Sequence, residues 1–199
     1  MSRIGLALIA ILFFLSSSLI AQSEDIYYYL YEYTDEDGNK VAIIIEMATD
    51  NPTSPGSEFS EVTADDIHQK GYLTPSESQQ QAKVIDEHTD QAGGFWGSYV
   101  NYGNTQDQCK WVDCGSFTDY TTGGVGTVFI RGSTWRQDWS PPSNPILVYE
   151  LSISRQATWV KIQYHYEYGS PVTFQWTQKG QHHWGNPNNM EHGQASAIW

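Results

Sequence analysis

The chain has 199 residues and a net charge of −13, from 23 acidic and 10 basic residues. So acidic a chain lacks the basic patches that bind nucleic acid or an anionic membrane surface. Residues 22–92 carry 16 of the 23 acidic side chains, whereas all eight tryptophans follow residue 92. We therefore distinguish two segments, 22–92 and 93–199, which either form separate units or share one core.

The first 21 residues have the pattern of a secretory signal peptide. Arg3 precedes an apolar run over residues 4–15, and Ala21 supplies a small residue at the cleavage position. The alternative is an uncleaved membrane anchor, because the apolar stretch approaches the lower length limit for a span. The pattern favours cleavage, which predicts a secreted, extracellular protein that begins at Gln22 and does not span a membrane.

Two strand-like runs, 26–33 and 40–47, flank the turn sequence TDEDGN and predict a β-hairpin. A register centred on the turn pairs tyrosines with aliphatic residues on one face. The pairs are Tyr27 with Met47, Tyr29 with Ile45, Tyr31 with Ile43, and Tyr33 with Val41. The opposite face is partly apolar, so we expect another segment to cover it.

Helix signals follow the hairpin. The sequence from Thr63 to Asp66 predicts the start of a short helix that ends near Gly71. Thr74 and Glu77 fit a capping box, and the proline between them fits the first helical position. This second pattern predicts a largely solvated helix over residues 75–88.

From residue 93 onward the sequence is typical of β structure. Strands are predicted at 94–103, 126–132, 145–154, 158–168 and 172–178, and the C-terminal tail is predicted to be mostly loop. The predicted fold is therefore mainly β: an antiparallel β-sandwich, jelly-roll-like, or a barrel. It carries an N-terminal hairpin and a short helical insert.

The chain has two cysteines, Cys109 and Cys114, in the sequence CKWVDC. A close pair in an oxidising compartment predicts a local disulfide, and a metal or redox pair is the alternative. The disulfide would fix the conformation of the loop between them. Trp111, within that loop, is then a candidate ligand contact.

The last three predicted strands suggest one functional face. The short connections RQA and YGSP predict that 145–154, 158–168 and 172–178 pair antiparallel. Alternate side chains of the three strands then form a polar face beside an apolar one. The polar face holds Glu150, Trp159, Lys161, Gln163, His165, Glu167, Thr173, Gln175 and Thr177.

This polar face has three interpretations. It is an ordinary solvated surface, a binding surface or a catalytic one. As a binding surface it would present Trp159, Gln163, His165, Glu167 and Gln175 to a glycan, because sugars stack on aromatic rings and hydrogen-bond to amides and carboxylates.

The catalytic interpretation rests on Glu150 and His165, which are diagonal neighbours in this register. A carboxylate–imidazole pair can position a general base. Glu150 and Glu167 would lie roughly 13 Å apart along the strands and one strand across, too far for a pair of glycosidase carboxyls.

No cofactor or metal site is predicted. His182, His183 and His192 lack the spacing of a zinc site, and the acidic hairpin turn lacks the glycine of a calcium loop. The leading prediction is a secreted protein that binds carbohydrate or a cell-surface partner.

Three alternatives to this leading prediction stay open. The first is a secreted hydrolase of glycans or esters that uses Glu150 and His165. The second is an extracellular structural or filament subunit whose hairpin adds strands to a neighbour's sheet. The third is a secreted toxin or effector restrained by its acidic N-terminal part. The sequence does not decide between a binding protein and an enzyme.

Overall fold

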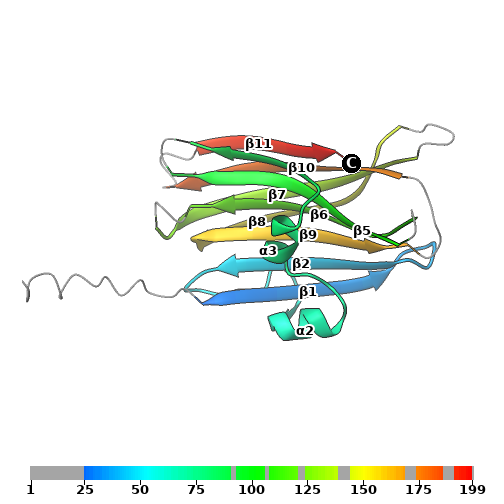
Figure 1. Ribbon diagram of the computed structural model, residues 1–199. Helices are drawn as coiled ribbons and strands as arrows, with labels where there is room; N and C mark the ends of the chain where they lie inside the picture. The colour runs from blue at the N-terminus through cyan, green and yellow to red at the C-terminus, as the bar shows by residue number, and fades with distance from the viewer. Residues whose placement is uncertain are drawn as a thin grey trace, which may run out of the picture.

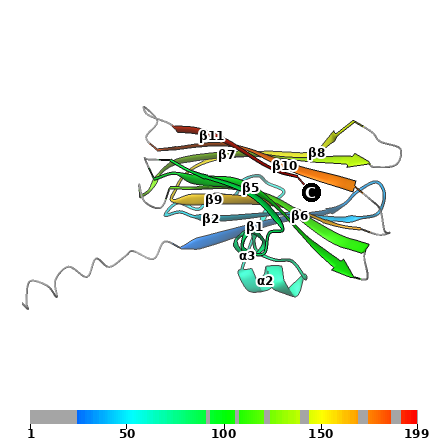
Figure 2. The ribbon, with the colours of Figure 1, turned by 45° about the horizontal axis from the view of Figure 1, so that its top comes forward.

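A computed structural model describes residues 25–90, 93–105, 108–120, 124–138, 144–168, 174–185 and 191–198. The predicted signal peptide lies outside the described residues. The described chain forms two antiparallel β-sheets stacked face to face, with two short helices on one outer side (Figures 1 and 2). The fold is mainly β, as predicted. It is consistent with a sandwich and is not closed into a barrel.

Sheet A, the larger sheet, contains seven strands. They are β1 (Ile26–Thr34), β2 (Lys40–Ala48), β3 (Ser60–Val62), β4 (Val84–Thr89), β5 (Phe95–Thr105), β6 (Gln108–Asp119) and β9 (Trp159–Glu167). Their spatial order is β3-β1-β2-β9-β6-β5-β4. Strands from both sides of residue 92 therefore belong to one sheet.

Sheet B has four strands: β7 (Gly126–Asp138), β8 (Ile146–Ala157), β10 (Phe174–Gly185) and β11 (Glu191–Ile198). Their spatial order is β11-β10-β7-β8. β11 lies where the sequence predicts loop, so that prediction is wrong for the tail. β7 and β10 also extend several residues beyond their predicted ends.

The main core fills the space between the sheets. β2 contributes Ile43 and Ile45, β9 contributes Ile162 and Tyr164, and sheet B contributes a buried row that includes Trp176. Alternate residues of each strand point into this layer, because successive side chains point to opposite faces of a sheet. The remaining residues of β2 and β9 face the outer side of sheet A.

The N-terminal hairpin has the predicted register. Tyr27 pairs with Met47 and Tyr33 with Val41, and the other two predicted pairs also form. Asp35 stabilises the turn, since its Oδ1 accepts hydrogen bonds from the backbone N–H groups of Asp37 and Asn39 at 3.0 and 2.8 Å. The hairpin's tyrosine-lined face turns towards sheet B.

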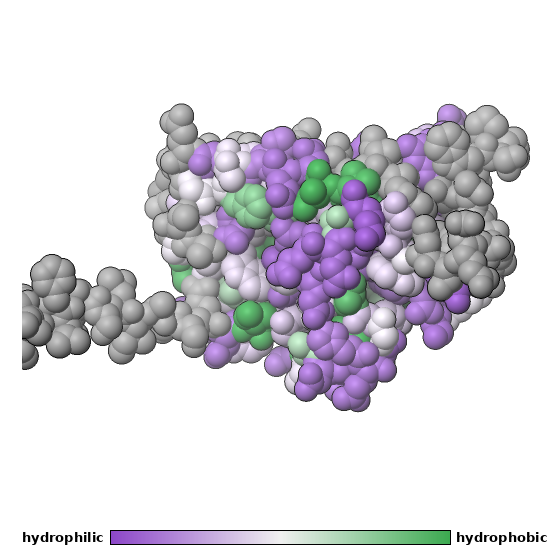
Figure 3. Space-filling model, in the orientation of Figure 1, coloured by the Kyte–Doolittle hydropathy of each residue, from purple (hydrophilic) through white to green (hydrophobic). Residues whose placement is uncertain are grey.

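The opposite face of the hairpin is covered, as expected. Residues 49–83 connect β2 to β4 across the outer side of sheet A, and we call them the cover segment. It includes β3, α2 (Ala64–Gln69) and α3 (Pro75–Gln80). Ile67 and Tyr72 of this segment bury Ile44 and its neighbours on β1 and β2. The exposed surface over both helices is hydrophilic (Figure 3).

Both helices begin as the sequence predicts. Thr63 and Thr74 are the N-caps, and each forms a complete capping box. The second helix is shorter than predicted: α3 ends at Gln80, and β4 pairs with β5 where helix was expected. β4 carries β-branched residues and has few apolar side chains at helical spacing, which favours a strand. Within the described part of the chain, no helix is both long and apolar enough to cross a membrane.

The predicted pairing of the last strands is wrong. β9 lies between β2 and β6 in sheet A, whereas β8 and β10 flank β7 in sheet B. Thr158 is the one residue between β8 and β9, and the commonest tight hairpin needs two. The chain therefore bends from sheet B into sheet A. The N–H of Thr158 donates to the Ala48 carbonyl of β2 at 3.0 Å.

The predicted disulfide is also wrong. Cys109 and Cys114 both belong to β6, five positions apart, which is roughly 16 Å along a strand. A disulfide requires Cα atoms within about 7 Å. Cys114 is buried in the core between the sheets and is not disulfide-bonded. The segment interpreted as a loop is thus a central strand of sheet A.

Candidate functional site

Most of the predicted ligand-binding residues meet on the outer face of sheet A. Trp159, Gln163, His165 and Glu167 alternate along β9 with residues that enter the core. Trp111 pairs with Glu167 in register and therefore lies on the same face. This face lies beneath the cover segment, so part of it is buried rather than solvated.

Gln175 and Glu150 do not join this group. Both lie on strands of sheet B, because the predicted three-strand sheet does not form. Glu150 is instead held by Arg131 at 2.7 Å and by Ser133 at 2.9 Å on the exposed side of sheet B. The predicted Glu150–His165 catalytic pair is therefore wrong: the two side chains belong to different sheets.

His165 forms a buried ion pair with a residue that the sequence did not indicate. Its Nδ1 lies 2.6 Å from Asp113 Oδ1, and the two side chains are 4% and 1% exposed. Burial acts to lower the pKa of His165, but the Asp113 and Glu167 carboxylates more than offset this and raise it to about 9. The imidazole is therefore positively charged at neutral pH.

This ion pair is fixed from above by the cover segment. Ser78 of α3 donates its hydroxyl to Asp113 Oδ2 at 2.7 Å. The rings of Tyr72 and Trp111 lie 4.7 and 6.0 Å from that of His165, measured between centroids. His165 is thus enclosed by Asp113, Tyr72 and Trp111, and Asp113 links it to Ser78 of α3, so its ring is shielded from an external ligand.

Gln163 also contacts the cover segment. Its side-chain amide donates to the Leu73 carbonyl at 3.1 Å and accepts from the Tyr99 hydroxyl at 2.9 Å. The same hydroxyl lies 3.1 Å from the Pro75 carbonyl at the start of α3. Buried polar groups need such partners, because an unpaired one costs about 1–3 kcal/mol. Gln163 is therefore also committed to holding the cover segment.

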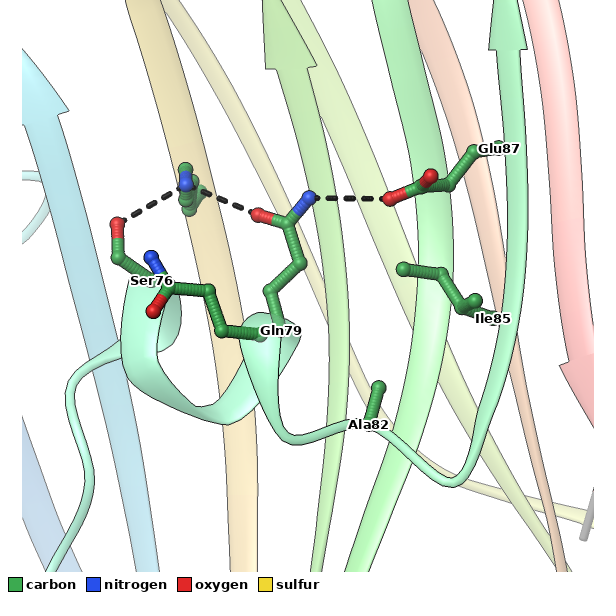
Figure 4. A pocket seen from close by; sticks show the side chains of 7 residues that line it. Ser76, Gln79, Ala82, Ile85 and Glu87 are labelled. Carbon is green, nitrogen blue, oxygen red and sulfur yellow. Dashed lines mark hydrogen bonds between the residues drawn. The ribbon is translucent and has the colours of Figure 1, made fainter.

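The accessible part of the face lies between α3 and β4. A pocket of about 420 Å³ opens there. It is lined by Ser76, Gln79, Gln80, Ala82, Ile85, Glu87 and Lys161. Figure 4 shows α3 forming one wall and β4 the other. Ile85 and Ala82 give the β4 side an apolar patch, and Ile85 is 41% exposed.

One chain of hydrogen bonds crosses the pocket from β2 to β4, and Figure 4 shows its part from Ser76 to Glu87. It begins at Glu46, which accepts from the Ser76 hydroxyl at 2.6 Å and from the Ser76 N–H at 2.7 Å. Lys161 Nζ donates to Ser76 Oγ and to Gln79 Oε1, both at 2.9 Å. The Gln79 amide then reaches Glu87 at 3.4 Å.

The charges in this chain are only partly solvated. Burial lowers the pKa of Lys161, against the opposing effect of Glu46, Asp119 and Glu87. Burial likewise raises the pKa of Glu46, against the hydrogen bonds from Ser76 and the charge of Lys161. The Lys161 ammonium also lies 5.2 Å from the centre of the Trp159 ring, within the range of a cation–π interaction.

Sequence reasoning did not select the residues that line this pocket. Lys161 shares the alternation of β9 with the predicted residues, and that alternation was its available signal. Ser76 and Gln79 follow the Thr74 cap, but a cap does not indicate where a helix docks. Asp113 was missed because β6 was interpreted as a disulfide loop.

The described residues contain no cluster of three or more His, Cys, Asp or Glu side chains suited to a metal ion. His182 and His183 point to opposite faces of β10. His182 is buried and its Nδ1 lies 2.7 Å from the Thr118 hydroxyl, whereas the ring of His183 packs on Phe129. The residues that line the pocket offer a ligand one hydroxyl, two amides, one carboxylate and one ammonium.

Comparisons with protein-family models, with curated proteins and with solved structures give no match. The chemistry of the site is thus the basis for the function proposed below.

Proposed function

We propose that the protein is an extracellular binding protein that recognises a carbohydrate in the pocket between α3 and β4. One observation carries this proposal: a pocket of ligand size combines an ammonium, two amides, a hydroxyl and a carboxylate. The Trp159 ring adjoins the same ammonium at 5.2 Å. The same groups would serve a free sugar or a glycan on a cell-surface protein.

The composition of the pocket fits the surface of a sugar. Sugar hydroxyls both donate and accept hydrogen bonds, and the Gln79 and Gln80 amides offer both kinds of group. The apolar side of a sugar ring would pack on Ala82 and Ile85. Trp159 does not line the pocket; it supports Lys161, whose ammonium lies over its ring at 5.2 Å. The volume of about 420 Å³ falls in the range of roughly 300–1,000 Å³ typical of ligand sites.

The charge of the pocket favours a neutral or an amino sugar over an acidic one. Lys161 is the single cation among the lining residues, and Glu46, Glu87 and Asp119 all act on its pKa. An acidic sugar would meet this excess of carboxylates and be repelled. We therefore expect a neutral or an amino sugar to bind more tightly than a uronic acid or a sialic acid.

The extracellular location is a separate part of the proposal. It rests on the signal-peptide pattern of residues 1–21. Expression of the full chain with its leader, followed by intact-mass measurement of the medium, tests it. We expect a product that begins at Gln22; retention of the full-length mass in the membrane fraction would contradict secretion.

The structure offers a matched control for the binding experiment. Trp159 lies under Lys161 at 5.2 Å on sheet A, and Trp135 lies under Lys179 at 5.3 Å on sheet B. Glycan-array hits obtained with the wild-type protein would be titrated by calorimetry. We expect Trp159→Ala to weaken binding tenfold or more, and Trp135→Ala to leave it unchanged.

A second pair of variants tests the pocket itself. Gln79→Ala removes an amide that lines it, and Lys161→Met removes the ammonium at similar length. Both should weaken binding while the thermal unfolding midpoint shows that the protein still folds. Equal affinity in all four variants, or the absence of any glycan ligand, would contradict the proposal.

A further inference from the structure

We propose that Ser76 is the nucleophile of an acyl-transfer reaction that hydrolyses a small carboxylic ester in the same pocket. In this reaction Glu46 is the base that takes the hydroxyl proton, and Lys161 is the acid that protonates the leaving alcohol. This activity goes beyond ligand binding and does not depend on the identity of the sugar.

The geometry around Ser76 is that of an activated hydroxyl. Its Oγ donates to Glu46 Oε1 at 2.6 Å, within the range of about 2.6–3.2 Å required between nucleophile and base. The Ser76 N–H holds the second oxygen of the carboxylate at 2.7 Å, which fixes its orientation. Lys161 Nζ approaches the hydroxyl from the pocket side at 2.9 Å.

Ser76, Lys161 and Glu46 differ in how accessible they are to a ligand. Ser76 and Lys161 line the pocket, so a bound ester can reach the hydroxyl and the ammonium. Glu46 lies beneath them and is 2% exposed. A base shielded from water keeps a high affinity for the proton, and its raised pKa agrees with that position.

Among the residues that the structure describes, two other serine–carboxylate pairs lack this combination. Ser78 donates to Asp113 at 2.7 Å, but both are fully buried and the carboxylate is paired with His165. Ser133 donates to Glu150 at 2.9 Å on the open face of sheet B, where Arg131 neutralises the carboxylate. Ser76 combines a buried carboxylate, an ammonium and an open pocket.

The first half of the reaction acylates the serine. As the Oγ–H proton moves to Glu46, Oγ forms a bond to the ester carbonyl carbon. The C–O bond to the alcohol then breaks, and the alcohol leaves with a proton from Lys161. The Lys161 ammonium, 2.9 Å from Ser76 Oγ, is the nearest positive charge to the developing oxyanion, whereas the Gln79 Nε2 is turned towards Glu87.

The second half restores the enzyme. Water attacks the acyl carbon and gives its proton to the neutral Lys161 amine. The C–Oγ bond breaks, and Ser76 recovers its proton from Glu46. One ester and one water thus yield one carboxylic acid and one alcohol. Ala82 and Ile85 line the opposite wall, so a short apolar acyl group fits there.

A fluorophosphonate probe tests the nucleophile, since it forms a covalent adduct with activated serines. We expect one adduct per chain, located at Ser76 by peptide mapping, together with hydrolysis of p-nitrophenyl acetate. Ser76→Ala should lose both the adduct and the turnover. Ser133→Ala is the matched control, because it removes a serine bonded to an exposed carboxylate, and it should leave both unchanged.

Two further variants test the assigned roles. Glu46→Gln and Lys161→Arg should each reduce turnover by about 10²-fold or more, the usual size of general acid–base effects. Lys161→Arg keeps the positive charge, so we expect this variant to fold, but arginine does not readily give up a proton. It therefore tests the proton transfer even if Glu46→Gln disturbs the fold. Equal turnover in Lys161→Arg and the wild type would refute the role of Lys161.

The wild-type protein alone can overturn the proposal. Absence of both adduct and ester turnover, or an adduct at a serine other than Ser76, refutes it without any variant. Sugar titration of the same sample separates this outcome from the binding proposal. Sugar binding without an adduct would refute the esterase activity alone.

Discussion

The outer faces of the two sheets have the same alternating sequence pattern, but the face of sheet A is partly buried and the face of sheet B is exposed. Each has polar side chains in alternation with a buried row, as in β9 and β10. On sheet A the cover segment buries His165, Gln163 and Glu46. On sheet B, Glu150 and Arg131 pair at the surface, with side chains 32% and 43% exposed.

This contrast shows that alternation identifies which side chains share a face, but not whether water reaches that face. Once a segment covers the face, every polar group on it needs a partner, and those partners become structural. Polar groups that can contact a ligand then remain only at the edge of the cover segment. On sheet A that edge is the pocket between α3 and β4.

The largest expected difference between the two faces concerns Asp113. Asp113→Asn leaves the buried, charged His165 without its main counter-ion. Breaking a buried pair in this way typically costs about 3–5 kcal/mol. Urea unfolding should therefore show a large loss of stability, and a loss below about 1 kcal/mol would mean that the covered face behaves like an open one.

The second effect is the pH dependence of the covered face. The pKa of His165 is raised to about 9 in the folded protein, against about 6.5 when unfolded. A raised pKa gives stability that is complete below about pH 6.5 and is lost as the pH rises through about 9, with a total on the order of 3 kcal/mol.

This pH dependence is measured by urea unfolding between pH 6 and pH 10. His165→Gln is the control, because it removes the titrating group while keeping a polar side chain. We expect the stability of this variant to change less across the same range. A parallel decline in both proteins would assign the effect to other groups.

A smaller effect is expected from the apolar contact of the cover segment. Ile67 is the buried residue of α2 and packs on the outer face of β1 and β2. Ile67→Val removes one methylene group and should cost about 1 kcal/mol. Ile146→Val, at a half-exposed position on β8, is the matched control and should leave the urea midpoint unchanged.

The smallest effect is expected on the open face. Glu150→Gln removes an ion pair with Arg131 that is exposed and screened by salt. Thermal unfolding in 150 mM salt should not distinguish this variant from the wild type. A large shift of the unfolding midpoint would show that sheet B uses its polar face as sheet A does.

Local features of the fold were predictable from the sequence. The hairpin register follows from a turn sequence between two runs of similar length, and both helix starts follow from the Thr63 and Thr74 caps. These signals act over a few residues, so neighbouring residues are enough to read them.

Contacts between distant segments were not predictable in the same way. A connection of a few residues suggested that β8 and β9 pair, yet Thr158 turns the chain into the other sheet. The pairing of His165 with Asp113 depends on β9 lying beside β6, 52 positions away. No local pattern indicates which distant strand lies beside β9. The sequence therefore predicts which side chains of β9 share a face, but not that Asp113 is the partner of His165.

The central position of β9 has a consequence for folding kinetics. β9 pairs with β2 on one side and with β6 on the other, and Ile162 lies opposite Ile45. The middle of sheet A therefore forms through contacts between residues that are far apart in the sequence. Such topologies fold slowly, and their unpaired strand edges promote association between chains in the meantime. Refolding from urea is therefore expected to be slow, and its yield to fall as protein concentration rises.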